Sequence, residues 1–171
     1  MVIWLIGLSG SGKTTLGNKL KDYCDTLEQK SFIIDGDLVR GFFDNDLGYS
    51  REERMANIKR IMLAANVLSQ SGTIAIVCNI SPFEELRQFA RRKFADYVEI
   101  YLNQDVSALR KDDVKGMYRN NAGKTDIVGL DLKFDKPLYS DLTINTGVEN
   151  VEQSFQKIVG FLKTRYSRRF G

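Results

Sequence analysis

The segment GLSGSGKTT, residues 7–15, has the residue types and the spacing of a phosphate-binding loop. Its pattern, G-x-x-x-x-G-K-[ST], leaves backbone N–H groups free to close around phosphate oxygens, because glycine and serine put little side chain in the way. We expect Lys13 to reach the β- and γ-phosphates of a nucleoside triphosphate, and the Thr14 hydroxyl to ligate Mg²⁺. The nucleotide contacts predicted within this loop are Gly7, Ser9, Gly10, Ser11, Gly12, Lys13, Thr14 and Thr15.

The alternative is a Gly/Ser turn that joins a strand to a helix and holds no ligand. However, an apolar run over residues 2–6 precedes the segment, and a helical pattern begins after the lysine. This strand–loop–helix order is the context that phosphate binding needs, since the helix N-terminus adds partial positive charge. The sequence therefore favours the nucleotide loop.

Two carboxylates, Asp35 and Asp37, follow the next apolar run at residues 31–34. A carboxylate at the carboxyl end of a parallel strand lies beside the phosphate loop. Phosphoryl transfer to a hydroxyl needs a group that orients the acceptor and takes its proton, and Asp37 is our candidate for this base. We also expect Asp37 to join Thr14 in holding Mg²⁺. Asp35 fits a helix N-cap as well as a catalytic role, and Arg40 is expected to clamp an anionic acceptor.

The elements that must position these groups alternate along the chain. Apolar stretches with strand character recur at residues 2–6, 31–34, 73–78, 97–102 and 142–144, and helical patterns fill the intervals. Such alternation predicts an α/β fold in which a parallel sheet carries helices on both faces. A chain of 171 residues with 43% hydrophobic content can bury one sizeable core, so we expect a single domain over residues 1–171.

Helix boundaries are marked by capping signals. Ser50 and Glu53 form an S-x-x-E capping box ahead of a clear apolar stripe, and Ser81 with Glu84 repeats the same spacing. A last helix is predicted over residues 151–162, where apolar residues recur at spacings of four, three and four. The sequence thus predicts N-caps at Ser50 and at Ser81.

Residues 111–137 form a polar, Gly- and charge-rich stretch without core periodicity. A segment of this length inside a compact domain is typical of a functional lid. Lys115, Arg119 and Lys124 within it are expected to gather around the transferring charge when the lid closes and excludes water. The alternative is a solvated basic loop.

Composition excludes several classes of function. The net charge of +3 is too small for a nucleic-acid binder, which normally carries a dense basic stripe. The first apolar run is too short for a signal peptide or a membrane span, so we expect a cytoplasmic protein. Cys24 and Cys78 have no C-x-x-C spacing and the chain has no histidine, so both are interpreted as reduced core thiols.

Six short segments of the sequence together resemble a known family. The segments GLSGSGKTT, DGDLVR, DLGYSREERMANIKR, ISPF, DVKGMY and GLD occur in the order and approximate spacing of the adenylylsulfate kinases. These enzymes use MgATP to phosphorylate the ribose 3′-hydroxyl of adenosine 5′-phosphosulfate. The resemblance runs from Val2 to about Thr146 and implies a P-loop kinase fold with a five-stranded parallel sheet and a small lid. It also suggests a homodimer.

The resemblance implies roles for individual residues. Lys13 and Asp37 are its catalytic residues, and Ser81 matches a serine that the family is often described as phosphorylating. We interpret Ser81 first as an N-cap, and then as a substrate contact instead of a covalent intermediate, because in-line transfer does not need one. ATP contacts are implied for Arg110 and, at the adenine, for Thr146 and Val148. The implied acceptor-binding residues are Asp37, Arg40, Tyr49, Arg54, Asn57, Ile80, Ser81, Lys115, Ile127, Gly129 and Leu130.

The residue types agree with that set. Tyr49, in a loop ahead of the capped helix, is placed to stack on a base, and Arg54 and Asn57 project from one face of that helix. The alternative for Arg54 is a surface residue paired with Glu53 or with the turn at Ser50.

Departures from the family lie on the acceptor side and in the lid, and the ATP loop is intact. Ile127 stands where the family has an aromatic residue that covers the acceptor adenine, and the loss of one stacking face weakens base binding by about 1 kcal/mol or more. A family arginine near Asp112 is displaced, with Arg110 the nearest substitute. Glu84 stands where arginine is common, and the chain begins at its first predicted strand, without the N-terminal extension usual in these kinases.

Three hypotheses follow. The favoured one is an adenylylsulfate kinase. The second is a relative that phosphorylates the ribose of another nucleotide, such as a cytidine diphosphate derivative used in surface-polysaccharide modification, and Ile127 and the absent extension favour it. The third is a nucleotide-dependent regulatory switch, which needs no acceptor clamp. The combination of Asp37, Arg40, Arg54 and Asn57 argues against the switch.

Overall fold

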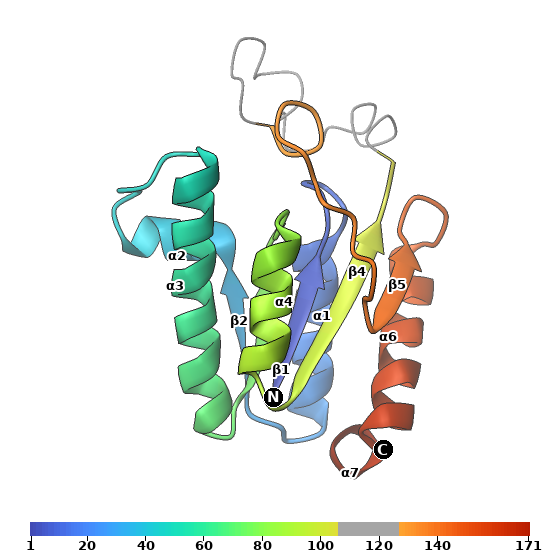
Figure 1. Ribbon diagram of the computed structural model, residues 1–171. Helices are drawn as coiled ribbons and strands as arrows, with labels where there is room; N and C mark the ends of the chain where they lie inside the picture. The colour runs from blue at the N-terminus through green and yellow to red at the C-terminus, as the bar shows by residue number, and fades with distance from the viewer. Residues whose placement is uncertain (106–126) are drawn as a thin grey trace.

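The computed structural model describes residues 1–105 and 127–171. Its centre is a sheet of five parallel strands in the order β2-β3-β1-β4-β5 (Figure 1). The predicted α/β fold is confirmed, and each predicted strand forms with bounds that differ by at most one residue. The strands are β1 (Val2–Ile6), β2 (Ser31–Asp35), β3 (Ile74–Cys78), β4 (Tyr97–Asn103) and β5 (Leu142–Asn145).

Helices cover both faces of this sheet (Figure 1). On one face lie α1 (Lys13–Thr26), α6 (Val151–Arg165) and the short α7 (Ser167–Phe170). On the other face lie α3 (Arg51–Gln70) and α4 (Glu84–Lys93), with α2 (Gly36–Phe42) leading from β2 towards α3.

Two hydrophobic cores lie between these helices and the sheet, one on each face. Alternate residues of β1 enter different cores, because successive side chains of a strand point to opposite faces. Ile3 and Leu5 pack under α1 and α6, whereas Trp4 packs under α3 and α4. All five residues of β1 are buried, which explains why this strand reads as a continuous apolar run.

The capping box predicted at Ser50 is confirmed. The Glu53 N–H donates to the Ser50 hydroxyl at 3.3 Å, and the Ser50 N–H donates to the Glu53 carboxylate at 3.0 Å, at the start of α3. Asn150 and Gln153 form a second box at the start of α6, which the sequence analysis missed. Both helices thus begin with their first backbone N–H groups satisfied.

The capping box predicted at Ser81 is wrong. α4 begins at Glu84 after Phe83, which has no capping side chain, and the Glu84 N–H donates to the Asp135 carboxylate at 3.5 Å. Ser81 instead has a left-handed backbone, with φ of 49°, and its hydroxyl is bound by Trp4 and Asn79. The serine therefore belongs to a turn ahead of the helix, where these two contacts hold the hydroxyl away from the helix N-terminus.

The predicted core thiols are confirmed, since Cys24 and Cys78 are both free and buried. Burial raises the pKa of Cys78 to about 12 and that of Cys24 to about 11. The thiolate is the reactive form of cysteine, so both thiols are chemically inert at neutral pH.

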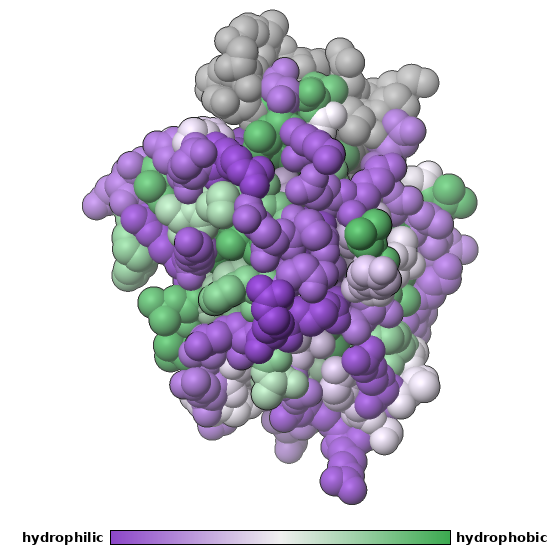
Figure 2. Space-filling model, in the orientation of Figure 1, coloured by the Kyte–Doolittle hydropathy of each residue, from purple (hydrophilic) through white to green (hydrophobic). Residues whose placement is uncertain are grey.

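Apolar side chains are exposed around α2 and α3, on the left of the face in Figure 2, which is otherwise largely hydrophilic. Among the exposed apolar side chains of these two helices are Leu38 and Phe42 of α2, and Leu63 and Val67 of α3. Exposed apolar side chains that gather on one side of a domain are typical of a contact surface. No helix in the described part of the chain is long and apolar enough to cross a membrane.

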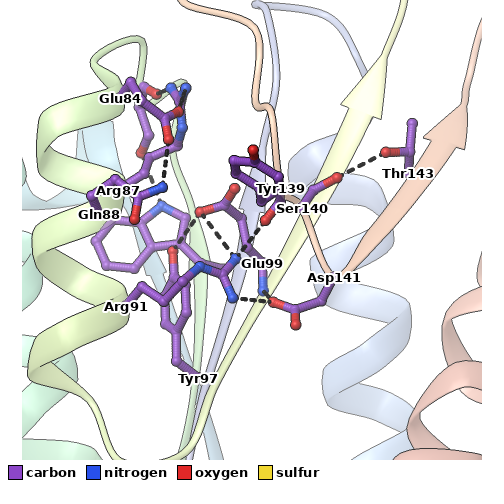
Figure 3. A network of polar contacts seen from close by, with 12 residues as sticks. Glu84, Arg87, Gln88, Arg91, Tyr97, Glu99, Tyr139, Ser140, Asp141 and Thr143 are labelled. Atoms are coloured by element: carbon purple, nitrogen blue, oxygen red, sulfur yellow. Dashed lines mark hydrogen bonds and ion pairs between the residues drawn. The ribbon is translucent and has the colours of Figure 1, made fainter.

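A polar network lies between α4, β4 and the segment that leads into β5 (Figure 3). Glu99 of β4 is 3% exposed and accepts a hydrogen bond from the Tyr97 hydroxyl at 3.0 Å. Arg91 of α4 donates to the Asp141 carboxylate at 3.0 Å and lies 3.9 Å from the Glu99 carboxylate. The Glu99 N–H also donates to Asp141, at 2.9 Å. The network therefore attaches the segment before β5 to both α4 and β4.

We predict that Glu99→Gln becomes more stable relative to the wild type as pH rises. Burial raises the pKa of Glu99 above its usual 4.5, although the Tyr97 hydroxyl and nearby arginines oppose the shift. Between 4.5 and the raised pKa, the folded protein binds a proton that the unfolded chain has released. The wild type therefore loses stability as pH rises through this window, and a glutamine does not titrate. Denaturant unfolding of both proteins between pH 4.5 and 8 measures the difference, and a constant difference would contradict the prediction.

Candidate active site

The phosphate loop joins β1 to α1, as predicted. Gly12 is the N-cap of α1 with φ of 90°, and no side chain caps this helix. A Cβ at Gly7 would lie 2.6 Å from the Leu102 carbonyl oxygen, so this close approach requires glycine. The Ser11 hydroxyl is buried in the loop without a partner among the described residues. In contrast to α3 and α6, the start of α1 keeps its backbone N–H groups for an anion.

Lys13 folds back over this loop. Its Nζ donates to the carbonyl oxygens of Gly7 at 2.9 Å and Leu8 at 2.7 Å. The charge thus lies at the loop that is expected to hold phosphates. Ser9, another of the predicted nucleotide contacts, lies in the same loop and is not without a partner.

Thr14 and Asp35 are in contact at the start of α1. The Thr14 hydroxyl donates to the Asp35 carboxylate at 3.1 Å, and the other carboxylate oxygen of Asp35 caps α2 through the Asp37 N–H at 2.9 Å. Hydroxyl and carboxylate oxygens are ligands that Mg²⁺ prefers, and Mg²⁺ bound with a nucleotide needs only one or two protein ligands. These residues fit a magnesium ion. The sequence predicts Thr14 and Asp37 as magnesium ligands, whereas the carboxylate in contact with Thr14 is that of Asp35.

Asp37 lies in the first turn of α2, at the carboxyl end of β2. Its side chain is exposed, and its carboxylate accepts no hydrogen bond from residues 1–105 or 127–171. An exposed carboxylate without a protein partner at this edge of the sheet is available to a bound hydroxyl.

A pocket of about 270 Å³ opens beside the phosphate loop. Thr146, predicted at the adenine, is one of its lining residues, whereas Val148 is exposed and does not line it. The pocket has the position expected for the nucleoside of ATP, next to the loop and the start of α1. Its lining residues are Gly10, Ser11, Gly12, Thr15, Leu16, Gln104, Thr146, Glu149, Val151 and Ser154.

Near β2, Arg40 of α2 binds the backbone of the loop that precedes α3. Arg40 is 7% exposed, and its Nη1 donates to the carbonyl oxygens of Leu47 at 2.8 Å and Gly48 at 2.9 Å. It also lies 4.5 Å from the centre of the Tyr49 ring, and Arg54 lies 5.0 Å from the same ring. Tyr49 remains 51% exposed. The structure therefore brings these three predicted residues together, with Arg40 bound to the loop backbone.

Asn57 lies against Gly36, and Ser81 is bound to Asn79, whose side chain also lies against Gly36. Asn57 and Ser81 are both buried, at 3% and 2% exposure. Asn57 Nδ2 is 3.4 Å from the Gly36 carbonyl oxygen, and its Oδ1 has no partner among the described residues. Every polar group of Ser81 is bound. Its N–H and hydroxyl donate to Asn79, its hydroxyl accepts from Trp4, and its carbonyl accepts from Arg87 at 2.7 Å.

The remaining predicted acceptor residues form a small apolar group. Ile80 packs with Leu8 and Val128. Residues 127–132 make a turn in which Gly129, at φ of 93°, donates to the Leu132 carbonyl oxygen at 2.7 Å, and both Ile127 and Leu130 are in this turn. Arg110 and Lys115, and with them most of the predicted lid, lie outside the described residues.

Asn79 is a residue that the sequence analysis missed. It follows β3 directly, at the same sheet edge as Asp35 and Asp37. The sequence contains the pattern that would have indicated Asn79, because Asp35 is predicted as a site residue from its position immediately after a buried apolar run. No cluster of three His, Cys, Asp or Glu side chains that could hold a metal forms within the described residues.

Comparisons with known proteins agree with this geometry. The sequence profile described as "Adenylylsulphate kinase" matches residues 1–145. The adenylyl-sulfate kinase of Picosynechococcus sp. is 35% identical over 161 residues, which cover 93% of this chain and 91% of that protein. That of Staphylococcus haemolyticus is 37% identical over 169 residues, covering 96% and 85%. The chain belongs to the adenylylsulfate kinase family.

Solved structures support the same assignment. The APS kinase of Mycobacterium tuberculosis, solved in complex with AMPPNP and APS, is 27% identical with a TM-score of 0.88, and the match covers 95% of this chain and 96% of that one. A shikimate kinase from Aquifex aeolicus, at 14% identity and a TM-score of 0.55, shares the fold. As a member of the adenylylsulfate kinase family, the protein is an ATP-dependent kinase with an alcohol group as acceptor.

We predict that Arg40→Met lowers the free energy of unfolding by about 1–3 kcal/mol, because two carbonyl oxygens lose a charged donor in a buried place. Arg51→Met is the matched control. Arg51 is in an exposed ion pair with Glu85, so its loss should cost less than about 1 kcal/mol. Urea unfolding measures both, and equal losses would show that Arg40 does not hold the loop.

Proposed function

We propose that this protein transfers the γ-phosphoryl group of MgATP to the ribose 3′-hydroxyl of adenosine 5′-phosphosulfate, giving 3′-phosphoadenylylsulfate. The observation that carries this proposal is the exposed Asp37 carboxylate, which has no protein partner in the described chain and lies at the sheet edge that bears the phosphate loop. The Mycobacterium tuberculosis relative solved with AMPPNP and APS supports this pair of substrates. Residues 1–171 act as one kinase domain, with a lid at about 111–137.

In this mechanism, Asp37 accepts the proton of the ribose hydroxyl as the hydroxyl oxygen bonds to the γ-phosphorus. The bond from the γ-phosphorus to the bridging oxygen breaks, and ADP leaves with the electron pair. The backbone N–H groups at the start of α1 and the Lys13 ammonium stabilise charge on the phosphates. Thr14, with Asp37 or Asp35, would hold the Mg²⁺ that comes with ATP, and this ion would supply further charge neutralisation.

The acceptor is recognised by groups on the β2–α3 side of the site. Tyr49 stacks on the base, since its ring is 51% exposed and is held in place by contacts with Arg40 and Arg54. Asn57 lies against Gly36 on the acceptor side of the site, where its buried Oδ1 has no partner among the described residues. Ser81 shapes the wall of the site and forms no phosphoserine, because a buried hydroxyl with two hydrogen-bond partners is poorly placed to attack phosphorus. Ile80, Ile127, Gly129, Leu130 and Lys115 complete the site.

A second candidate function is 3′-phosphorylation of a pyrimidine nucleotide, such as a cytidine diphosphate derivative for surface-polysaccharide modification. Ile127 favours it, because an aliphatic side chain offers less stacking to a purine than the aromatic residue implied by the family resemblance. The regulatory switch gains no support from the site, since a switch has no use for the Asp37 carboxylate or for the Tyr49 platform.

The protein acts in the cytoplasm in this proposal, where ATP is available. We also propose a homodimer, and the exposed apolar side chains of α2 and α3, such as Phe42, Leu63 and Val67, support a contact surface between copies.

The acceptor is tested by ADP formation from MgATP with adenosine 5′-phosphosulfate beside cytidine, uridine and guanosine nucleotides that carry small anionic tails. We expect kcat/KM for adenosine 5′-phosphosulfate to be at least about tenfold higher, which corresponds to about 1.4 kcal/mol of transition-state binding. Asp37→Asn is the control. It should lose about 10²-fold or more in turnover and keep its affinity for ATP.

Preference for a pyrimidine nucleotide would replace the first candidate with the second. Full activity in Asp37→Asn would overturn the assignment of the base.

A further inference from the structure

Asn79 lies at the carboxyl end of β3, which is the strand between β1 and β2 in the sheet. It follows β3, whose last residue pairs with Leu5 of β1 on one side and with Asp35 of β2 on the other. The Asn79 N–H donates to the Leu5 carbonyl oxygen at 3.2 Å, so the backbone is fixed next to β1. The side chain therefore starts between the phosphate loop and the Asp35–Asp37 segment, where ligands of open α/β sheets bind.

The orientation of the Asn79 amide is determined by Ser81. Asn79 Oδ1 accepts the Ser81 N–H at 2.9 Å and the Ser81 hydroxyl at 2.9 Å. Because a backbone N–H can only donate, the atom facing Ser81 must be the oxygen, and the NH₂ group must point the other way. This direction leads to Gly36, where a Cβ would lie only 2.4 Å from Asn79 Nδ2. Glycine at position 36 thus makes room for the amide.

The NH₂ group of Asn79 is an unused donor. Nδ2 makes no hydrogen bond within residues 1–105 and 127–171, and it is not among the polar atoms sealed from solvent. Asn57 approaches Gly36 as well, through the Gly36 carbonyl oxygen, and its buried Oδ1 also lacks a partner in the described chain. An unused donor and an unused acceptor therefore lie against the same glycine, between Asp35 and the candidate base Asp37.

An amide that is aimed by two hydrogen bonds and keeps two free N–H groups is suited to bind an oxygen atom. The Asn79 NH₂ group is open to solvent at a ligand-binding edge, and the buried Asn57 Oδ1 at the same glycine has no partner in the described chain, so this place points to a ligand. We propose that Asn79 Nδ2 donates a hydrogen bond to an oxygen of the acceptor nucleotide, and so positions the reacting end of the acceptor beside Asp37. This proposal rests on the proposed kinase function and adds Asn79 to the residues that select and orient the acceptor.

The competing explanation is that Asn79 only holds the Ser81 turn. The variant Asn79→Asp distinguishes the two explanations. Its carboxylate can accept the same two hydrogen bonds from Ser81, but it has no N–H group to donate to the acceptor. A turn-holding role predicts wild-type kinetics for Asn79→Asp. The donor role predicts that kcat/KM for the acceptor falls about 10²-fold, since a hydrogen bond is lost and an anion repels the acceptor, while KM for ATP stays within about twofold.

A second variant avoids the added charge. Asn79→Ser keeps a side-chain oxygen that can accept the Ser81 N–H in an ST turn, and we expect kcat/KM for the acceptor to fall about tenfold. Asn66→Asp in α3, away from the sheet edge, controls for the change of Asn to Asp and should behave as the wild type. Thermal unfolding of each variant shows whether the fold is kept.

Wild-type kinetics in either folded variant at position 79 would overturn the proposal, as would a change confined to KM for ATP. The assay uses whichever nucleotide the wild type phosphorylates best. A wild type that prefers another acceptor therefore refutes adenosine 5′-phosphosulfate as the substrate and still tests Asn79. A wild type that phosphorylates none of them refutes both.

Discussion

The parallel pairing of β3 with β1 on one side and β2 on the other sets the position of every group in the site. Cys78 pairs with Leu5 and with Asp35, so the three strands end at one level. The phosphate loop, the Asp35–Asp37 segment and the Asn79–Ser81 turn therefore leave the sheet side by side. Strand register is held by the backbone and by cores on both faces, which gives the loops above it a rigid base.

The Ser81 turn connects this edge to the rest of the molecule. Its left-handed backbone is strained for a serine, and four contacts from Trp4, Asn79 and Arg87 offset that strain. Arg87 also donates to the Asp135 carbonyl oxygen at 2.5 Å. One buried arginine therefore joins the turn beside the acceptor site to the end of the proposed lid region.

Much of the fold and the core of the site could be predicted from local sequence patterns. The phosphate loop and the carboxylates after β2 are short segments whose function depends on residues next to each other, so their residue types are sufficient. Local patterns did not predict the surroundings of Ser81 correctly. Its spacing to Glu84 is that of a capping box, but its contacts are with Trp4, distant in sequence, and with Asn79, whose direction depends on the packing of three strands. The contact of Thr14 with Asp35 likewise depends on how α1 and β2 lie in space.

The proposed reaction is the attack of a ribose 3′-hydroxyl, activated by the Asp37 carboxylate, on ATP. Its most direct test is the position of the new phosphate in the product, determined by phosphorus–proton coupling in NMR after reaction of the wild type with MgATP and adenosine 5′-phosphosulfate. We expect coupling of the new phosphorus to the ribose H3′ proton alone. Coupling to H2′, or release of inorganic phosphate without a phosphorylated nucleotide, would contradict it.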